Sequence, residues 1–384
     1  MDEFKARTRI IDPLGPDDRE SIRNFLAPLG LELEDDVELS AVVDEGGAPI
    51  AVASLAGDVL KCVGVLPGRD GEGAAARAVS AVMAEAEAKG RKRLFVYTKP
   101  ANRTIFEGLG FVMLAEVQAL PAIARGAIAR SDIARGDGAR GDGVALLEND
   151  VHAFDSWVEG IRRTLPGGTA GGAVVVNCNP FTLGHRYLIE RAAATCAAEG
   201  VSGGNGAGGG TLLVLVVAGD RSSFPGTVRE ALVRAGTSDL SNVVVASGAS
   251  YCVSGATFPA YYLKRKSDAA ELQAALDATL FATRIAPALG IRRRFVGTEP
   301  YCQVTSAYNR AMAAILPAHG IELVEIARLE RDGAAVSASA VRAALRDGEM
   351  ARVRTLVPPS TAAWLESPEA VDVLERIRTG DGRH

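Results

Sequence analysis

The sequence predicts an α/β protein of two domains, an α+β domain followed by a doubly wound domain on a parallel sheet. The chain has 384 residues, 48% hydrophobic and 23% charged, which is enough to bury more than one core. After about residue 170, short β-branched runs alternate with helical patterns, as in parallel sheets covered by helices. Before residue 120, strand patterns joined by glycine turns are mixed with helices, which indicates a separate α+β domain.

The first domain, residues 1–150, is predicted to end after a low-complexity insertion. Residues 122–143 repeat Ala, Arg, Gly and Asp without a sustained apolar period, so we expect a flexible surface segment there. A connecting helix and a linker should occupy 151–172. The elements expected before them are a helix at 17–29, strands at 37–43, 50–55 and 59–65, an alanine-rich helix at 74–89, a strand at 94–98, a short helix that ends at Gly108, and a closing strand at 144–148.

The second domain, residues 173–384, alternates buried strands with helices. Ligands of such sheets bind at the carboxyl ends of the strands, so we expect a cleft at that edge. The predicted strands are 173–176, 212–217, 243–246, 294–296 and 321–324, and the predicted helices are 184–198, 228–235, 267–289 and 306–319.

The loop after the first of these strands carries a candidate anion site. Thr182 should lie near the N-cap of the next helix, with Gly184 opening the helix and His185 in its first turn. Hydroxyl, imidazole and free backbone amides then converge where the helix dipole favours negative charge. On these residues alone, a structural cap with a nearby histidine remains an equal interpretation.

A second segment, about 150 residues downstream, has the same character. Ser337 or Ser339 would cap a helix whose early turns contain Arg342, which gives another hydroxyl-and-cation site at a helix start. Serine caps and helical arginines are common, so this segment is informative only when paired with the first.

Together the two segments resemble the HxGH-type and ISxSxxR-type loops of the nucleotidylyltransferase superfamily. The first histidine of that motif is replaced here by Thr182, as in the phosphopantetheine adenylyltransferase branch. More narrowly, the chain resembles the citrate lyase ligase family in five blocks that occur in the family's order over most of residues 170–350. These blocks are NCNPFTLGHRYLIE, GDRSSFPGTVREALV, SYCVSGATFPAYYLK, VGTEPYCQVTSAYN and VSASAVR.

This resemblance implies an ATP-dependent, AMP-forming acid–thiol ligase. Acetate would be activated as acetyl-adenylate with release of pyrophosphate, and the acetyl group would pass to the thiol of the prosthetic group on the acyl carrier subunit of citrate lyase. ATP implies Mg²⁺, because a hard cation normally bridges its phosphate oxygens. The implied catalytic residues are Thr182, His185 and Arg342. The implied ATP-binding residues are Asn179, Phe181, Gly184, Arg229, Gly297, Ser337 and Ser339.

Some of these roles have structural alternatives. Asn179 could orient the nucleotide or cap the turn at Pro180. Arg229 could contact phosphate or acetate, or lie on a solvated helix face. Glu299, Tyr301 and Cys302 should lie near the cleft, and the sequence assigns no role to them.

The first domain resembles the GNAT acetyltransferase fold. Gly71 and Gly73 fit that family's glycine turn, which offers amides to the pyrophosphate of coenzyme A, but Gly68 stands where an Arg or Gln is usual. A coenzyme-A-like arm of the carrier could dock there, or the domain could serve only to stabilise its neighbour.

Composition and charge narrow the partners. A formal net charge of −5 argues against bulk electrostatic binding of nucleic acid. No apolar stretch reaches the length that spans a bilayer, so we expect a cytoplasmic protein without membrane contact. The five cysteines and four histidines show no metal-ligand spacing, and we expect most of the cysteines to be buried hydrophobes. The oligomeric state is not predicted.

Three functions therefore compete. The first is the acetate:carrier-protein ligase. The second is a nucleotidylyltransferase that adenylylates a phosphate-bearing metabolite such as a pantetheine phosphate. The third is a non-catalytic nucleotide sensor.

Overall fold

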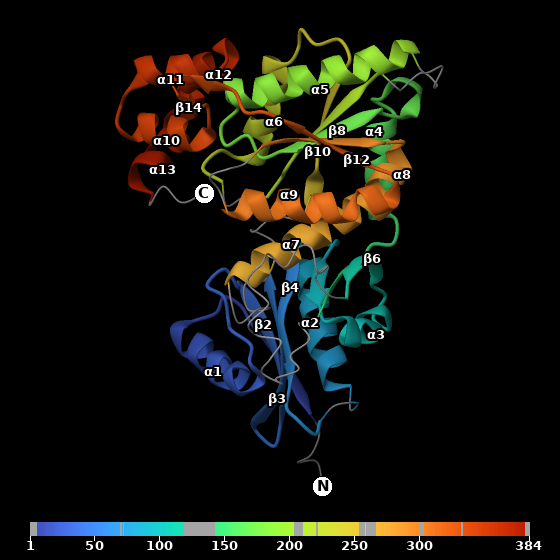
Figure 1. Cartoon of the computed structure of the whole chain (residues 1–384). Helices are drawn as coiled ribbons and strands as arrows, with labels where there is room; N and C mark the ends of the chain where they lie inside the picture. Colours follow the sequence, from blue (N-terminus) through green and yellow to red (C-terminus); the bar gives the residue numbers. More distant parts are fainter. Residues whose placement is uncertain are drawn as a thin grey trace, which may run out of the picture. The chain divides into compact units, whose positions relative to one another are not determined.

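The computed structural model describes residues 6–69, 71, 73–118, 143–202, 210–219, 222–252, 258, 266–298, 303–331 and 333–380. The chain forms two compact units (Figure 1). The first contains Met1–Phe154 and Thr257–Leu276, and the second contains Asp155–Ala256 and Asp277–His384. The return of 257–276 to the first unit was not expected from the sequence. Within that unit, the ring of Phe258 meets Tyr97 edge-on, with centroids 5.4 Å apart.

The first unit is built on a seven-stranded sheet in the order β1-β2-β3-β4-β5-β7-β6. Its strands are β1 (Arg7–Ile11), β2 (Leu39–Glu45), β3 (Ala48–Ala56), β4 (Val59–Val65), β5 (Phe95–Thr98), β6 (Val112–Val117) and β7 (Val144–Glu148), and its helices include α1 (Pro16–Leu26), α2 (Ala74–Ala88) and α3 (Arg103–Glu107). All the pairs are antiparallel except β4 with β5, which align only at Val59↔Phe95 and Leu60↔Val96. This order confirms the GNAT-like α+β arrangement.

Helix α2 packs against β2, β3 and β4 through its small residues. Ala78, Val79, Val82 and Ala86 are fully buried in one core with the apolar faces of the strands. Strand β1 was not predicted. Its residues are mostly exposed at the edge of the sheet, so it lacks the apolar alternation that marks half-buried strands.

The second unit contains a five-stranded parallel sheet in the order β10-β9-β8-β11-β12. The strands are β8 (Gly172–Val176), β9 (Leu212–Val216), β10 (Val243–Ser247), β11 (Arg293–Gly297) and β12 (Glu322–Ile326). The order reverses between β8 and β11, and this confirms the doubly wound prediction. Gly172 is required at the start of β8, because a Cβ there would lie 2.5 Å from the Phe295 ring.

Helices cover both faces of this sheet (Figure 1). Helix α5 (Leu183–Ser202) lies over one face and α9 (Gln303–Ile315) over the other, while α6 (Gly226–Gly236) connects β9 to β10. Helix α4 (Ala153–Arg162) precedes β8. The single helix expected at 267–289 consists of α7 (Lys266–Leu280), a π-helical turn (Phe281–Ile285) and α8 (Ala286–Leu289).

The C-terminal part adds four helices, of which only the first was predicted. A short hairpin of β13 (Glu330–Arg331) and β14 (Ala334–Ala335) leads into α10 (Ala338–Arg346), α11 (Met350–Leu356), α12 (Pro359–Leu365) and α13 (Val371–Thr379). Val341, Leu345, Val353 and Ile377 join the core that contains β8, β9 and α5. These helices therefore hold the Ser337 segment against the sheet.

The flexible insertion predicted at 122–143 lies outside the described residues except for Gly143. Among the residues that the structure describes, no helix is both long and apolar enough to cross a membrane.

Candidate functional site

The first predicted loop, 177–182, lies at the point where the order of the parallel sheet reverses, and the second predicted loop, 336–342, contacts it as described below. The loop 177–182 follows β8 and leads into α5, while Gly297 ends the neighbouring β11. Both lie at the carboxyl ends of their strands, which is where doubly wound sheets bind ligands.

Thr182 and His185 form a reciprocal cap at the start of α5. The Thr182 Oγ1 accepts a hydrogen bond from the backbone N–H of His185 at 3.3 Å. In return, the Thr182 N–H donates to His185 Nδ1 at 3.1 Å. This is the geometry of a capping box, with a histidine in the place of the usual Glu or Gln.

The cap determines how the imidazole is protonated. A backbone N–H can only donate, so Nδ1 must be an acceptor and we infer that the neutral ring carries its proton on Nε2. Burial, and secondarily the positive charge of Arg328, lower the pKa of His185 to about 4. At neutral pH the residue is therefore an uncharged hydrogen-bond donor.

Thr182 is fully buried, and both its hydroxyl and its amide are bonded to His185. It therefore positions the imidazole, and this placement does not favour the direct phosphate contact that the resemblance implied. Phe181 is also fully buried, stacked on the His185 ring at 6.1 Å between centroids. A Cβ at Gly236 would lie 2.4 Å from Phe181, so this ring belongs to the core, and this placement does not favour the ATP contact that the resemblance implied.

The second loop lies directly on the first. A Cβ at Gly184 would lie 2.3 Å from the carbonyl oxygen of Val336, so no larger residue fits between the two backbones. The resemblance implied that Gly184 contacts ATP. In the fold, this glycine is needed because the two loops touch.

Ser337 is the N-cap of α10, and its Oγ accepts from the Ala340 N–H at 3.2 Å. Ser339 is exposed, with its Oγ 3.3 Å from that of Ser337. The starts of α5 and α10 thus adjoin, so that the positive ends of two helix dipoles lie close together.

Arg342, in α10, connects the second loop to the first. Its Nη1 donates to the carbonyl oxygen of Asn179 at 2.5 Å, across 163 residues of sequence. Asn179 is itself buried, and its Oδ1 accepts from the Phe224 N–H at 3.1 Å. Asn179 therefore joins three segments of backbone, which favours its structural alternative. Arg342 is half-buried and keeps further donors for a ligand.

Arg229 points into the protein. It is completely buried, and its guanidinium donates to the carbonyl oxygens of Phe224, Asn177, Val217 and Gly219 and to Asn177 Oδ1. These bonds tie the loop after β8 to the loop after β9. We infer that Arg229 shapes the cleft without touching a ligand; neither the predicted phosphate contact nor the solvated face fits this placement.

Gly297 lies at the open end of β11, and the nearest atom to a Cβ there would be Arg328 Cγ at 3.9 Å. Sequence reasoning missed Arg328. It comes two residues after β12, so the rule that ligands bind beyond the carboxyl ends of strands would have found it if applied to the fifth strand.

In the first unit, Gly71 and Gly73 are exposed and have positive φ, at 87° and 75°. Gly73 is the N-cap of α2 and provides no side chain to bond the first amides of that helix. The turn therefore has the local geometry expected of an anion-binding helix start.

Glu299, Tyr301 and Cys302 lie outside the described residues. The four described cysteines, Cys62, Cys178, Cys196 and Cys252, are buried thiols that form no disulfide, and their burial was expected. Burial raises the pKa of each of these thiols, so none is an activated nucleophile.

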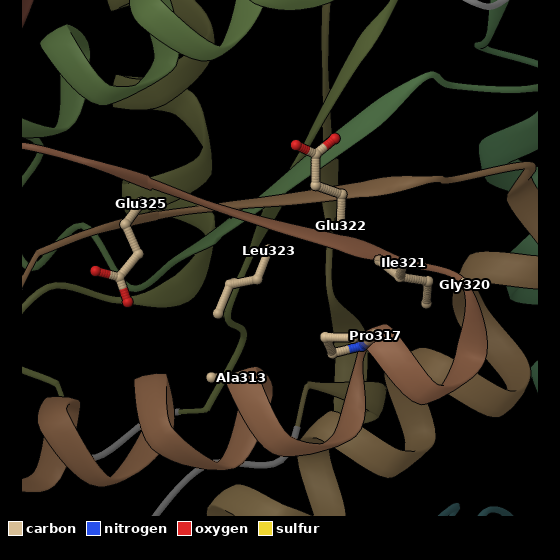
Figure 2. Close-up of a pocket in the computed structure, with 7 residues that line it drawn as sticks. All are labelled: Ala313, Pro317, Gly320, Ile321, Glu322, Leu323 and Glu325. Atoms are coloured by element: carbon tan, nitrogen blue, oxygen red, sulfur yellow. The ribbon is translucent and has the colours of Figure 1, made fainter.

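An open groove of about 620 Å³ runs between α9 and the edge strand β12. Figure 2 shows Leu323 extending from β12 toward Ala313 of α9, with Glu322 on the opposite side of the strand. The described residues that line this groove are mostly apolar. None of them belongs to the two predicted loops, 177–185 and 336–342, which we call the signature loops.

Comparisons with known proteins agree with this arrangement. Residues 171–365 match the family model described as citrate lyase ligase C-terminal domain. Over 351 residues, the chain is 35% identical to the citrate (pro-3S)-lyase ligase of Klebsiella pneumoniae, covering 90% of this chain and 92% of the relative. It is 32% identical to the corresponding ligase of Escherichia coli, covering 90% of each chain.

A solved structure of an IAA acetyltransferase from Bacillus cereus is similar to 38% of this chain and 98% of its own, at 16% identity and a TM-score of 0.28. The fold of the first unit is defined by its strand order and not by this likeness. The matches to the curated relatives extend across nearly the whole length of both chains, through the signature loops as well as the first unit. The chain therefore belongs to the citrate lyase ligase family of enzymes.

Proposed function

We propose that this protein activates acetate with ATP and transfers the acetyl group to the thiol of the prosthetic group on the acyl carrier subunit of citrate lyase. The observation that carries the proposal is the contact between the Gly184 and Val336 backbones, which brings two helix N-termini and Arg342 together. Such a group of donors and positive charges favours a polyanion. The names of the curated relatives point to citrate lyase as the protein acted on, and the family resemblance of the sequence implies acetate and the carrier subunit.

In the first step, a carboxylate oxygen of acetate attacks the α-phosphorus of ATP. The bond from that phosphorus to the bridging oxygen breaks, and pyrophosphate leaves with the electron pair. Acetate is already ionised at neutral pH, so the enzyme needs no strong base. Its residues have to orient the reactants and stabilise charge on the phosphates.

The described residues suit that task. His185 would donate from Nε2 to a phosphate oxygen, held in this orientation by Thr182. Ser339 and Arg342 would donate from the α10 side of the cleft. Mg²⁺, when bound with ATP, would neutralise part of the phosphate charge.

In the second step, the carrier's thiol loses its proton to solvent water and its sulfur attacks the acetyl carbonyl carbon. The bond from that carbon to the AMP oxygen breaks, its electron pair stays on that oxygen, and the products are the thioester and AMP. The turn at Gly71 and Gly73 is our candidate for holding the phosphates of a coenzyme-A-like arm, because its amides lack a side-chain cap.

Exchange of labelled pyrophosphate into ATP tests the proposal. It should depend on acetate and should not require the carrier. Exchange that ignores acetate and responds to a pantetheine phosphate would support the nucleotidylyltransferase alternative. ATP binding without exchange under either condition would support a sensor.

A further inference from the structure

Arg186 follows His185 in the first turn of α5, and every nitrogen of its guanidinium bonds within the protein. Its Nε donates to Glu190 Oε1 at 2.6 Å, one turn farther along α5. Its Nη1 and Nη2 donate to the two carboxylate oxygens of Asp239, at 2.5 and 2.6 Å. Nη1 also donates to the carbonyl oxygen of Gly236. A guanidinium bonded in this way does not serve a phosphate, so its effect on the reaction passes through its partners.

The bonds to Asp239 and Gly236 fix the end of α6 against the start of α5. Gly236 is the last residue of α6, where the carbonyl groups have no partner within the helix and a cation is favoured. The hydrogen bond from Arg186 lowers the pKa of Asp239 to about 2, so the pair is charged at neutral pH. Exposed ion pairs contribute little on their own, but this one is bidentate and shares its arginine with a backbone carbonyl.

Gly236 in turn lies against the ring that contacts His185. A Cβ on Gly236 would be 2.4 Å from Phe181 Cε1 and 2.9 Å from its Cδ1, so the glycine backbone packs directly on this ring. The Phe181 ring is fully buried and lies 17° from parallel to the His185 imidazole. The contacts therefore run from Arg186 through Gly236 and Phe181 to His185, and they begin and end on neighbouring residues of one helix.

We propose that Arg186 is a positioning residue, which with Asp239 holds Gly236 against Phe181 and thereby fixes the His185 imidazole. The donation from that imidazole to a phosphate oxygen rests on the proposed function. The Thr182 cap holds the ring only at Nδ1, and one hydrogen bond leaves the ring free to tilt about it. The packed Phe181 ring supplies the second restraint, and precise placement of a donor is worth a large factor in rate.

The first test measures acetate-dependent pyrophosphate exchange on the full chain over a range of ATP concentrations. Arg186→Ala should lower the maximal rate by about 10-fold, less than the loss of the donor itself. The ATP concentration at half-maximal rate should stay unchanged, because Arg186 contacts no phosphate. Arg186→Lys should recover part of the rate, since it restores the charge but not the fork. Asp239→Asn, which keeps the Gly236 bond, should give a smaller loss in the same direction.

Arg234→Ala is the matched control. Arg234 is an exposed arginine of α6 whose Nε and Nη2 donate to Glu230 Oε1, at 3.1 and 2.7 Å, within its own helix. Its removal breaks an ion pair of the same i,i+4 spacing as that of Arg186 with Glu190, and the exchange rate should not change. A normal maximal rate in Arg186→Ala, or a loss confined to the ATP dependence, overturns the proposal.

A double variant separates positioning from a general loss of stability. If Arg186 acts through His185, adding Arg186→Ala to His185→Ala should slow exchange no further, because no imidazole remains to be positioned. Losses that multiply in the double variant would mean that Arg186 acts independently of His185, and they overturn the proposal.

A final measurement does not depend on catalysis. In protein labelled at phenylalanine and histidine, the NMR contacts between the Phe181 and His185 rings should weaken in Arg186→Ala and persist in Arg234→Ala. Unchanged ring contacts in Arg186→Ala overturn the proposal. If the unaltered protein shows no acetate-dependent exchange, the ligase chemistry is wrong, and these ring contacts still decide whether Arg186 positions His185.

Discussion

Arg229 and Arg342 resemble each other in the sequence, because each follows a short loop at the start of a helix. The fold surrounds the Arg229 guanidinium with backbone carbonyls and leaves Arg342 half-exposed beside Asn179. Thr182 and His185 likewise differ in whether their polar groups are used up within the protein. The threonine is buried as a cap, and the partly buried histidine keeps its Nε2 proton as a further donor.

Replacement of His185 by alanine should remove one donor to the reacting phosphates. We expect acetate-dependent pyrophosphate exchange to fall by about 10² to 10³-fold in a folded protein, the usual effect of losing such a group. Arg191→Ala, an exposed change farther along α5, is the control and should leave exchange unchanged. Near-normal exchange in His185→Ala would remove the phosphate role.

The low pKa of His185 also predicts a pH dependence of folding. Between about pH 6.5 and about pH 4, the unfolded chain binds a proton that the folded chain does not, so stability should fall as the pH falls. After allowance for partial exposure, the loss between pH 7 and pH 5 should be up to about 1 kcal/mol. Urea unfolding should show a shallower pH dependence for His185→Gln. Parallel curves for the two proteins would contradict this.

At the scale of elements, the site is a junction of two helix starts. The capping box begins α5, the Ser337 cap begins α10, and the Gly184–Val336 contact sets their separation. The helices α11 to α13 add apolar residues to the core beneath α10, so they support the second loop from behind.

Gly184→Ala should force the two loops apart, because its Cβ would meet a backbone carbonyl oxygen that cannot rotate away. We expect a loss of about 1 to 3 kcal/mol in unfolding free energy, together with weaker ATP binding. Gly160→Ala in α4 is the matched control, since a Cβ there meets nothing within 4 Å. It should stabilise the protein by up to about 1 kcal/mol. Equal stabilities of the two variants would show that the loops are free to separate.

Arg342 is the polar connection between the same elements. Arg342→Ala should weaken ATP binding or slow its reaction, and Arg342→Lys should recover only part of the loss, because a point charge cannot reproduce a fork. Exchange kinetics over a range of ATP concentrations would measure both effects. Normal behaviour of both variants would mean that the Ser337 to Arg342 segment is only a capped helix.

At the scale of the whole molecule, each of the two units has a glycine-dependent helix start. In the second unit, the glycine at α5 is buried against another loop. In the first unit, Gly71 and Gly73 are exposed and hold the turn in left-handed conformations that other residues rarely adopt.

If the turn at Gly71 and Gly73 holds the carrier's arm, Gly73→Val should leave pyrophosphate exchange intact. Acetyl transfer should then need about 10- to 100-fold more carrier. Gly90→Val is the control, because Gly90 also has positive φ and open surroundings but lies beyond the other end of α2. Equal carrier dependence in the two variants would indicate that the first unit only stabilises its neighbour.

The sequence by itself determined two kinds of feature. The first is those strands of both sheets whose residues alternate between apolar and polar or are all apolar, and the second is the two helix starts with their capping residues. These features depend on neighbours within a few residues, such as the three-residue span from Thr182 to His185. The exposed strand β1 and the hairpin before Val336 were missed because neither has a hydrophobic period that would indicate a strand.

Only the tertiary structure decided which polar groups remain for a ligand. Arg229 bonds carbonyls up to 52 residues away, and Arg342 bonds one 163 residues away. A donor that finds a buried acceptor inside the protein has no hydrogen left for a phosphate, and such pairings depend on the complete fold. The sequence therefore predicted the two helix starts, while the packing of β8, β11 and α10 decided which of their polar side chains bond within the protein.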